Sequence, residues 1–336
     1  MWLKRSEKLK VLFLIKGWQV ASSRYRVLQY IPYLENKGVK VKVILYPRSL
    51  RKNWSFFKSL YHYDIIFCQR KRFHTWRLWL LRKRANKIIF DFDDSIMHRD
   101  SNAKNPISKT RMRRFVNMIK ASDGVIAGNK YLKRNVLRYN MNVEVIPSPI
   151  DIEQYSQKQY NSENIDVVLG WIGDYGSIHY LEKMRAVFDI LGRKYPNLKL
   201  KIVCGVFFDC NEIEVIKKQW NSEDEIKDLQ SFDIGLMPLM DDPWSWGKCG
   251  LKIIQYQGVG VPVVCTPAGI NRDLVKNGEN GFWAKDQKEW VRKLSILIED
   301  SHLRKKMGII GRDRVKKEYS FQACAPRMYQ FLKTIL

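Results

Sequence analysis

Short apolar runs alternate with longer amphipathic stretches along the chain, and this alternation limits the fold more than any other feature. The short runs are rich in valine and isoleucine, which is typical of buried strands, and the longer stretches are typical of helices. Strands that are separated by helices form βαβ units, which build parallel sheets. In the first half of the chain, strands are predicted at 10–15, 39–45, 64–68, 87–92, 123–127 and 143–146, with helices at 22–36 and 108–121.

The pattern stops at Pro147-Ser148-Pro149 and at the polar stretch 154–164, which we interpret as a linker. Strands are predicted again at 166–171, 198–203, 233–238, 261–265 and 281–284, with helices at 178–194, 252–257, 285–299 and 302–318. The sequence therefore predicts the α/β class, with two Rossmann-like doubly wound domains that face each other across a cleft. We assign residues 1–158 to the first domain, 159–318 to the second, and 319–336 to a C-terminal helix that packs back on the first domain.

Ligands of open α/β sheets bind outside the carboxyl ends of the strands. When two such sheets face each other, the predicted site lies in the cleft between the domains. The residues expected on its walls are Gly17, Arg24, Asp93 and Asp94 on one side, and Gly173, Lys248 and Gln255 on the other.

Basic residues are concentrated in the first domain, because residues 1–158 hold 34 Lys and Arg against 11 Asp and Glu, whereas residues 159–336 hold 26 against 23. A positive field attracts phospholipid headgroups, nucleic acid or a phosphorylated acceptor. Aromatic residues are interleaved with these cations, which is typical of a helix in the headgroup region of a membrane. We predict that an anionic membrane surface contacts Arg70, Lys71, Arg72, Trp76, Arg77, Trp79, Arg82, Lys83 and Arg84. In the alternative, the aromatic residues belong to the core and the cations are solvated.

The chain has no apolar run of the ~20 residues that a membrane span needs. The run Val11–Ile15 is too short for a signal peptide, and the six cysteines include no C-x-x-C pair. We therefore expect a cytoplasmic protein with reduced thiols, without a metal site or a disulfide framework. Only one glycine, Gly17, lies in the turn after the first predicted strand, so an NAD site of the G-x-G-x-x-G type is not expected.

The stretch from Phe232 to Gly269 carries the most informative pattern, in which a strand, a loop with two tryptophans, a helix and a further strand follow one another. Lys248 and Lys252 are four residues apart, so on a helix they share one face near its N-terminus. Two ammonium groups at a helix start are suited to a diphosphate. Gln255 is expected on the same face, where its amide can bind ribose or sugar hydroxyls. The alternative is a pair of solvated lysines on a surface helix.

Two further loops are candidates for phosphate binding. The loop Gly170–Gly176 is rich in glycine, which lets backbone N–H groups approach a phosphate, although an ordinary tight turn has the same composition. Arg24 and Arg26 lie at the start of the first predicted helix, where they either bind a phosphate bidentately or are solvated.

A cluster of carboxylates ends the strand at 87–92 and allows three interpretations. Asp93 or Asp94 either positions the acceptor or acts as a base, which requires an oxygen within ~3 Å of the reacting hydroxyl. Alternatively, they cap the next helix. In the third interpretation, Asp91-Phe92-Asp93 forms an Asp-x-Asp metal motif, which belongs to a single-domain architecture that this chain does not show.

Several motifs resemble those of family-4 glycosyltransferases, which have the two-Rossmann-domain GT-B architecture. The resemblance spans almost the whole chain and is strongest over 123–320. Besides the stretch 232–269, the matching motifs are 123–128, 145–151, 169–173, 268–275 and 277–282. The resemblance implies a retaining glycosyltransferase that needs no cofactor and moves a sugar from a nucleotide-diphosphate sugar, of the UDP, GDP or dTDP type, to an acceptor hydroxyl. The implied acceptor is a lipid-linked or cell-surface glycan precursor of polysaccharide biosynthesis at the inner face of the membrane.

The resemblance also implies roles for individual residues. Many family members carry two glutamates eight residues apart, which correspond here to Gly247 and Gln255, and their Arg-x-x-x-x-Lys pair has no match after Gly173. The implied catalytic residues are Lys248, Lys252, Asp93 and Asp94. The implied donor-binding residues are Gly173, Asp174, Lys248, Cys249, Gly250, Lys252 and Gln255, and the implied acceptor or phosphate ligands are Gly17, Arg24 and Arg26.

Three other functions compete with this assignment. A basic nucleic-acid-binding protein fits the charge, but it gives no reason for a nearly neutral second half, so nucleic acid is not expected as a partner. A catalytically inactive relative fits the missing carboxylate at Gly247. A sugar phosphorylase shares the architecture but needs no basic membrane face.

Overall fold

The computed structural model describes residues 8–47, 50–160 and 166–336, so part of the predicted linker, 161–164, lies outside the described residues. The chain divides into two compact units. Unit 1 runs from the N-terminal part of the chain to Ser148 and also contains Trp246–Cys249 and Cys324–Leu336. Unit 2 contains Pro149–Ser245 and Gly250–Ala323.

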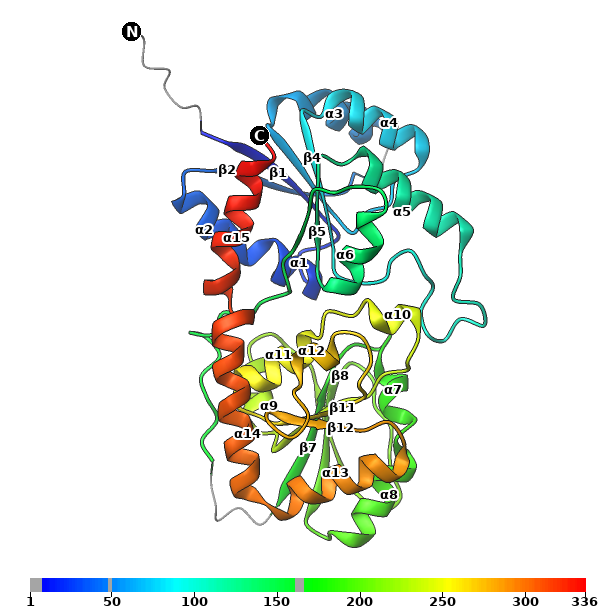
Figure 1. Cartoon of the computed structure of the whole chain (residues 1–336), viewed down its shortest axis with the longest axis vertical. Helices are drawn as coiled ribbons and strands as arrows, with labels where there is room; N and C mark the ends of the chain where they lie inside the picture. Colours follow the sequence, from blue (N-terminus) through cyan, green and yellow to red (C-terminus); the bar gives the residue numbers. More distant parts are fainter. Residues whose placement is uncertain (1–7, 48–49, 161–165) are drawn as a thin grey trace. The chain divides into compact units, whose positions relative to one another are not determined.

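Unit 1 is built on a six-stranded sheet in the order β2-β1-β3-β4-β5-β6, in which every neighbouring pair is parallel. The strands coincide with those predicted and are β1 (Lys10–Ile15), β2 (Lys40–Leu45), β3 (Ile65–Gln69), β4 (Lys87–Phe92), β5 (Gly124–Ala127) and β6 (Val143–Val145). Helices flank the sheet (Figure 1) and are α1 (Ala21–Arg26), α2 (Ile31–Asn36), α3 (Leu50–Ser59), α4 (Thr75–Arg84), α5 (Lys109–Ala121) and α6 (Lys130–Leu137).

The predicted helix at 22–36 is divided into α1, a 3-10 turn at Leu28–Tyr30, and α2. Pro32 explains the division, since it lies in the first turn of α2. Proline has no N–H group and clashes with the preceding turn, so it begins a helix more readily than it continues one.

Unit 2 contains a second parallel six-stranded sheet, in the order β12-β11-β10-β7-β8-β9. The strands are β7 (Val167–Ile172), β8 (Leu198–Cys204), β9 (Glu214–Gln219), β10 (Ile234–Met237), β11 (Val263–Cys265) and β12 (Gly281–Trp283). The strand β9 is not evident from the sequence, because this edge strand reads Glu-Val-Ile-Lys-Lys-Gln and none of its residues is buried. Strands at an edge often carry such charges, which hide the apolar alternation.

The helices of unit 2 include two that the sequence predicts as one. The predicted helix at 178–194 is interrupted at Lys183-Met184. The helices are α7 (Ile178–Glu182), α8 (Arg185–Lys194), α9 (Glu225–Gln230), α10 (Pro243–Trp246), α11 (Leu251–Gly258), α12 (Asn271–Leu274), α13 (Gln287–Glu299) and α14 (Ser301–Arg314), which continues through a π-helical turn at Val315–Tyr319 into α15 (Phe321–Thr334). The C-terminal part of α15 belongs to unit 1, where Phe331 and Ile335 occupy the space that a side chain at Gly124 would need.

The strand orders define one switch point in each sheet. In unit 1, β1 lies between β2 and β3, and in unit 2, β7 lies between β10 and β8. From β1 the chain passes to β2 on one side of it and then to β3 on the other. From β7 it passes to β8 on one side and later to β10 on the other. The loops that follow the strands therefore separate at the carboxyl ends of β1/β3 and β7/β10. Among the residues described, no helix has the length and hydrophobicity that crossing a membrane requires.

Candidate functional site

Lys252 lies at the switch point of unit 2, against the loop that follows β7. Its ammonium Nζ donates to Ser177 Oγ at 3.1 Å and lies 4.3 Å from the centre of the Trp171 ring. A Cβ atom at Gly173 would come within 2.8 Å of the same nitrogen. The Trp171 ring is buried, and its π-electrons attract the Lys252 ammonium in a cation–π contact. Lys252 and the Gly173 loop, which the resemblance assigns to the donor site, therefore lie together, and their binding of a donor stays a prediction.

The loop itself is a short turn in front of α7. Gly173 N donates to Val203 O at 3.0 Å, and the Ser177 hydroxyl donates to Asp174 O at 3.1 Å. Asp174 and Tyr175 are exposed at the tip of this turn. Ser177 is not among the predicted site residues, although its position directly after the glycine-rich loop could have indicated it.

Gln255 follows Lys252 on α11, but its side chain is buried in a different network. Its Nε2 donates to the Tyr155 hydroxyl at 3.0 Å, and that hydroxyl donates to Glu225 Oε1 at 3.0 Å. Glu225 also accepts from Trp220 Nε1 at 3.0 Å. The structure therefore gives Gln255 partners within unit 2, and its contact with a ribose stays a prediction.

Lys248 does not share a helix face with Lys252, and this part of the prediction is wrong. The helix α11 begins at Leu251, after Gly250 has taken a left-handed conformation with φ +66°. Because glycine adopts this conformation at little cost, the chain turns before the first helical residue. Lys248 therefore lies in the loop before α11. This loop, Trp246–Cys249, belongs to unit 1.

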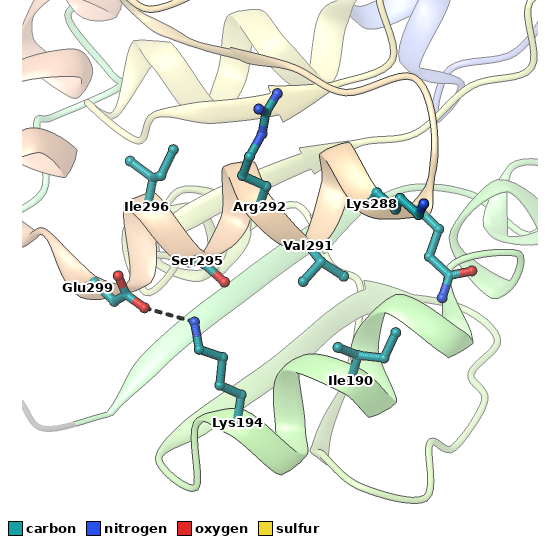
Figure 2. Close-up of a pocket in the computed structure, with 9 residues that line it drawn as sticks. Ile190, Lys194, Lys288, Val291, Arg292, Ser295, Ile296 and Glu299 are labelled. Carbon is teal, nitrogen blue, oxygen red and sulfur yellow. Dashed lines mark hydrogen bonds and ion pairs between the residues drawn. The ribbon is translucent and has the colours of Figure 1, made fainter.

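A hollow in unit 2 lies between α8 and α13, and none of the predicted site residues lines it (Figure 2). It has a volume of about 480 Å³, and the Lys194–Glu299 ion pair, 3.1 Å long, lies at one end. Lys194 and Glu299 are the last residues of their helices. Helices of a parallel α/β unit end near the amino ends of the strands, so this end lies opposite the edge where ligands bind.

The switch point of unit 1 is held together by Gln69, the last residue of β3. Its buried amide accepts from Ser23 Oγ at 2.9 Å and from Lys16 N at 3.4 Å, and it donates to Ser22 O at 2.6 Å. Gln69 thus ties the loop after β1, which includes Gly17, to the end of β3. Near this loop, Arg24 is half-buried, and its guanidinium lies 5.3 Å from the centre of the Tyr25 ring.

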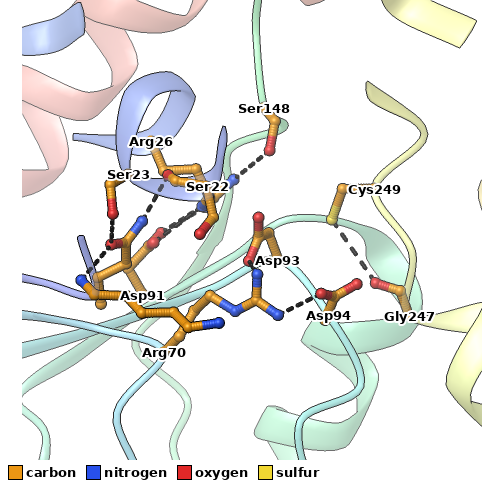
Figure 3. Close-up of polar contacts among 12 residues, drawn as sticks. Ser22, Ser23, Arg26, Arg70, Asp91, Asp93, Asp94, Ser148, Gly247 and Cys249 are labelled. Carbon is orange, nitrogen blue, oxygen red and sulfur yellow. Dashed lines mark hydrogen bonds and ion pairs between the residues drawn. The ribbon is translucent and has the colours of Figure 1, made fainter. Parts of the chain in front are cut away.

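Arg26 forms a buried ion pair with Asp91 (Figure 3). Its Nε lies 3.0 Å from Asp91 Oδ1 and 2.9 Å from Oδ2, and its Nη1 donates to Ile146 O and to Ser148 Oγ. The side chains of Arg26 and Asp91 are 1% and 0% exposed. The prediction that Arg26 binds a phosphate is wrong in this structure, because its guanidinium is buried against Asp91. Burial raises the pKa of the Asp91 carboxyl, and the adjacent guanidinium opposes that rise.

Arg70 holds the two carboxylates that follow β4. Its Nη1 lies 3.3 Å from Asp93 Oδ1, and its Nη2 donates to Asp94 Oδ2. Among the described residues other than glycine, only Arg70 has a positive φ, at 56°. This left-handed backbone is unfavourable for a long side chain, and such outliers persist where the surrounding contacts fix them. Arg70 was predicted to contact a membrane, and that prediction is wrong because its charge is taken up by Asp93 and Asp94.

Asp94 connects Arg70 to Lys248, whose Nζ lies 3.6 Å from Asp94 Oδ1. Burial alone raises the pKa of the Asp94 carboxyl, but Lys248 and Arg70 outweigh burial and lower this pKa below its ordinary value. Asp94 is therefore an anion at neutral pH. Its partner Asp93 differs, because Asp93 Oδ1 is buried and accepts no hydrogen bond from the described residues.

The structure contradicts the alternative in which Asp93 or Asp94 caps the next helix. The next helix is α5, which is capped by Ser108 through its side-chain contact with Arg111 N, so neither aspartate is a helix cap. Within the described ranges, no group of three or more His, Cys, Asp or Glu side chains is arranged to hold a metal ion.

The predicted membrane-facing residues divide into two groups. Arg72 donates to Ile96 O and Arg82 to Asp123, so these cations are tied to the unit as Arg70 is. By contrast, Trp76 and Trp79 on α4 are 51% and 55% exposed. We use the name basic-aromatic face for seven exposed residues of α3, α4 and the turn between α3 and β3. They are Trp54, Lys58, Tyr61, Trp76, Trp79, Lys83 and Arg84.

Two cations of the basic-aromatic face lie over its aromatic rings. Lys83 Nζ is 4.1 Å from the Trp79 ring centre, and Lys58 Nζ is 5.6 Å from that of Trp54. The alternative that the aromatic residues form core is correct for Phe56, Phe57 and Phe73, which are buried, but not for the tryptophans.

Comparison with known proteins finds a family match that lies mostly in unit 2. Residues 176–300 match the family model of the glycosyl transferases group 1. The chain is similar to the capsular polysaccharide biosynthesis glycosyltransferase CapM of Staphylococcus aureus, with 26% identity over 202 residues, which cover 56% of this chain and 51% of CapM. The match thus spans about half the length of this curated relative.

Two solved structures resemble the chain over nearly its whole length. Anabaena HepE in complex with UDP and glucose has a TM-score of 0.69 at 16% identity, with 97% of this chain and 100% of HepE covered. Sucrose-phosphate synthase from Thermosynechococcus elongatus has a TM-score of 0.76 at 13% identity, with 98% and 99% covered. These likenesses confirm the predicted GT-B fold. The match to the group 1 model and the similarity to CapM agree with the resemblance to family-4 glycosyltransferases.

We predict that Asp91→Asn lowers the free energy of unfolding by about 3–5 kcal/mol, because it leaves the buried charge of Arg26 without a counter-ion. The control is Glu144→Gln, which removes one partner of the exposed Arg327–Glu144 pair at 2.7 Å. This exposed pair is expected to contribute about 0–1 kcal/mol. Urea unfolding of both variants measures the difference, and equal losses would contradict the structural role of the Arg26–Asp91 pair.

Proposed function

We propose that this chain, a GT-B glycosyltransferase with a group 1 domain at residues 176–300, transfers a glycosyl group from a nucleotide-diphosphate sugar to an acceptor hydroxyl. The observation that carries the proposal is the position of Lys252 against Ser177 and the Gly173 loop. These residues lie at the carboxyl ends of β7 and β10, where open α/β sheets bind their ligands.

Lys252 stabilises the departing diphosphate in this mechanism. When the glycosidic bond to the phosphate breaks, negative charge develops on the leaving group, and a fixed ammonium nearby lowers the energy of that state. Lys252 suits the role because Ser177 and the Trp171 ring hold the ammonium in one place. A preorganised charge needs little reorganisation at the moment of reaction.

Asp93 is the better candidate to position the acceptor hydroxyl. Asp94 is engaged by both Arg70 and Lys248, whereas Asp93 Oδ1 has an ion pair with Arg70 alone, at 3.3 Å, and accepts no hydrogen bond among the described residues. An acceptor O–H group that donates to this oxygen would satisfy it and would become more nucleophilic.

The donor and acceptor classes follow from the relatives. HepE binds UDP and glucose and CapM serves capsular polysaccharide biosynthesis, so we propose a UDP-sugar as donor and a polysaccharide precursor as acceptor. GDP- and dTDP-sugars are the other donors to test. The retaining stereochemistry implied by the family resemblance belongs to the same proposal.

We predict that Lys252→Ala lowers kcat by about 10²–10³, the scale for losing one electrostatic contact in the transition state. Turnover is measured with UDP-, GDP- and dTDP-sugars. The matched control is Lys288→Ala, which removes one positive charge from the hollow between α8 and α13 in the same unit. A Lys252→Ala rate within threefold of wild type would exclude Lys252 from the site, and no turnover by the wild-type protein with any donor would favour the inactive alternative.

We also propose that the basic-aromatic face binds an anionic membrane at the cytoplasmic surface, where a lipid-linked acceptor would be presented. Exposed tryptophans are suited to the interfacial region, and each nearby Lys or Arg adds about 1 kcal/mol of attraction to anionic lipid. Trp76 and Trp79 combine with Lys83 and Arg84 on one helix to meet both requirements.

The double variant Lys83→Ala, Arg84→Ala is expected to reduce cosedimentation with anionic vesicles at least tenfold at low salt, because it removes two attractive charges. Lys305→Ala, Lys306→Ala makes the same change in charge on exposed positions of α14 and is expected to bind as wild type. Equal binding to neutral vesicles, unaffected by salt, would contradict an electrostatic face.

A further inference from the structure

We propose that Asn129 is a positioning residue that anchors the loop Trp246–Cys249 to unit 1 and thereby fixes Lys248 for the reaction. The inference rests on the proposed function, because Lys248 is one of the residues that the family resemblance implies for catalysis of glycosyl transfer. Its structural part, the anchoring of the loop, stands on contacts within unit 1 alone.

The side chain of Asn129 is 3% exposed and makes contacts in two directions. Its Oδ1 accepts from Leu132 N at 2.8 Å and so caps α6. Its Nδ2 donates to Lys248 O at 2.8 Å, approaches Trp246 O at 3.4 Å, and lies 3.9 Å from Cys249 Sγ. One amide therefore joins the start of α6 to a loop that is 119 positions away in the sequence.

Close packing around the loop supports the same anchoring. A Cβ atom at Gly128 would collide with Cys249 Sγ, and one at Gly247 would collide with Ser95. The Trp246 ring packs edge-on against Tyr131, in the first turn of α6, with ring centres 5.8 Å apart. The two glycines thus allow the loop to approach the unit to a distance that larger residues would prevent.

Lys248 is consequently held at both ends. Asn129 fixes its carbonyl, and Asp94, which Arg70 orients, lies 3.6 Å from its ammonium. Asparagine carries its acceptor oxygen and its donor NH₂ group on separate atoms, so Asn129 can accept from Leu132 N while it donates toward the carbonyls of Lys248 and Trp246. A serine or threonine hydroxyl caps a helix equally well, but it has one donor hydrogen on a shorter side chain. The capping role alone would be equally well served by serine or aspartate, so the donated bonds distinguish Asn129.

The loss of this amide is expected to affect the reaction more than the fold. A serine would keep the cap on α6 but leave the Lys248 carbonyl without its donor, which loosens the loop. A misplacement of a catalytic group by about 1 Å can lower the rate about 10²-fold.

The test compares Asn129→Ser with Asn140→Ser, which is a matched change in unit 1. Asn140 also accepts from a backbone N–H, that of Asn142, and donates to two carbonyls, those of Ile119 and Ser122. We expect kcat/KM with the sugar nucleotide to fall 10- to 100-fold in Asn129→Ser and less than threefold in Asn140→Ser, with similar melting temperatures. Equal losses in the two variants would overturn the proposal.

Two further measurements separate a positioning role from a structural one. In a Lys248→Ala background, the Asn129→Ser substitution should cost less than threefold, because the residue that it positions is gone. An undiminished loss there would show that Asn129 does not act through Lys248.

Hydrogen exchange tests the anchoring without any turnover. Asn129→Ser should speed exchange in the peptide that contains Trp246–Cys249, whereas Asn140→Ser should not. Unchanged exchange would refute the anchor. Faster exchange in a protein without glycosyltransferase activity would refute the proposed function but not the anchor.

Discussion

A cation held over a buried indole ring organises the carboxyl edge of the sheet in unit 2. Lys252 lies 4.3 Å from the Trp171 ring centre and 3.1 Å from Ser177 Oγ, and Gly173 leaves the space that the ammonium occupies. The parallel strand order separates the loops after β7 and β10 at this edge. Fold topology thus separates the two loops, and the side chains of Trp171 and Ser177, with the space left at Gly173, hold the positive charge there.

In unit 1 the charges are arranged differently, because arginines pair with carboxylates that are largely buried. Arg26 neutralises Asp91, and Arg70 neutralises Asp93 and Asp94, all within side chains that are at most 19% exposed. A buried carboxylate without such a partner would become protonated. The basic excess of this half of the chain therefore has two uses, since one part stabilises buried acids and the other forms an exposed face around Trp76 and Trp79.

The sequence predicted what is set by local patterns. All strands of unit 1 and the meeting of Lys252 with the Gly173 loop follow from runs of apolar residues and from the order of strand, loop and helix. Contacts between distant residues were not predictable in this way. The pairing of Arg26 with Asp91 spans 65 positions, and the charge of Arg26 alone suggested a phosphate ligand.

The errors have specific physical causes. Lys248 was placed on α11 because its spacing from Lys252 fits a helix, but the left-handed turn at Gly250 ends the loop two residues later. Asn129 was overlooked because a capping asparagine looks ordinary until its second set of partners is known. The charged edge strand β9 lacks the apolar alternation by which the other strands were recognised.

The central claim is that the Lys252 ammonium binds the diphosphate of the donor, and calorimetric titration tests it most directly. Wild-type protein and Lys252→Met are titrated with UDP and with uridine, which share a base and ribose but differ in the diphosphate. We predict that UDP affinity falls at least tenfold in the variant, about 1.4 kcal/mol, while uridine affinity is unchanged. Unchanged UDP affinity in Lys252→Met, in a protein whose wild type binds UDP, would contradict the account.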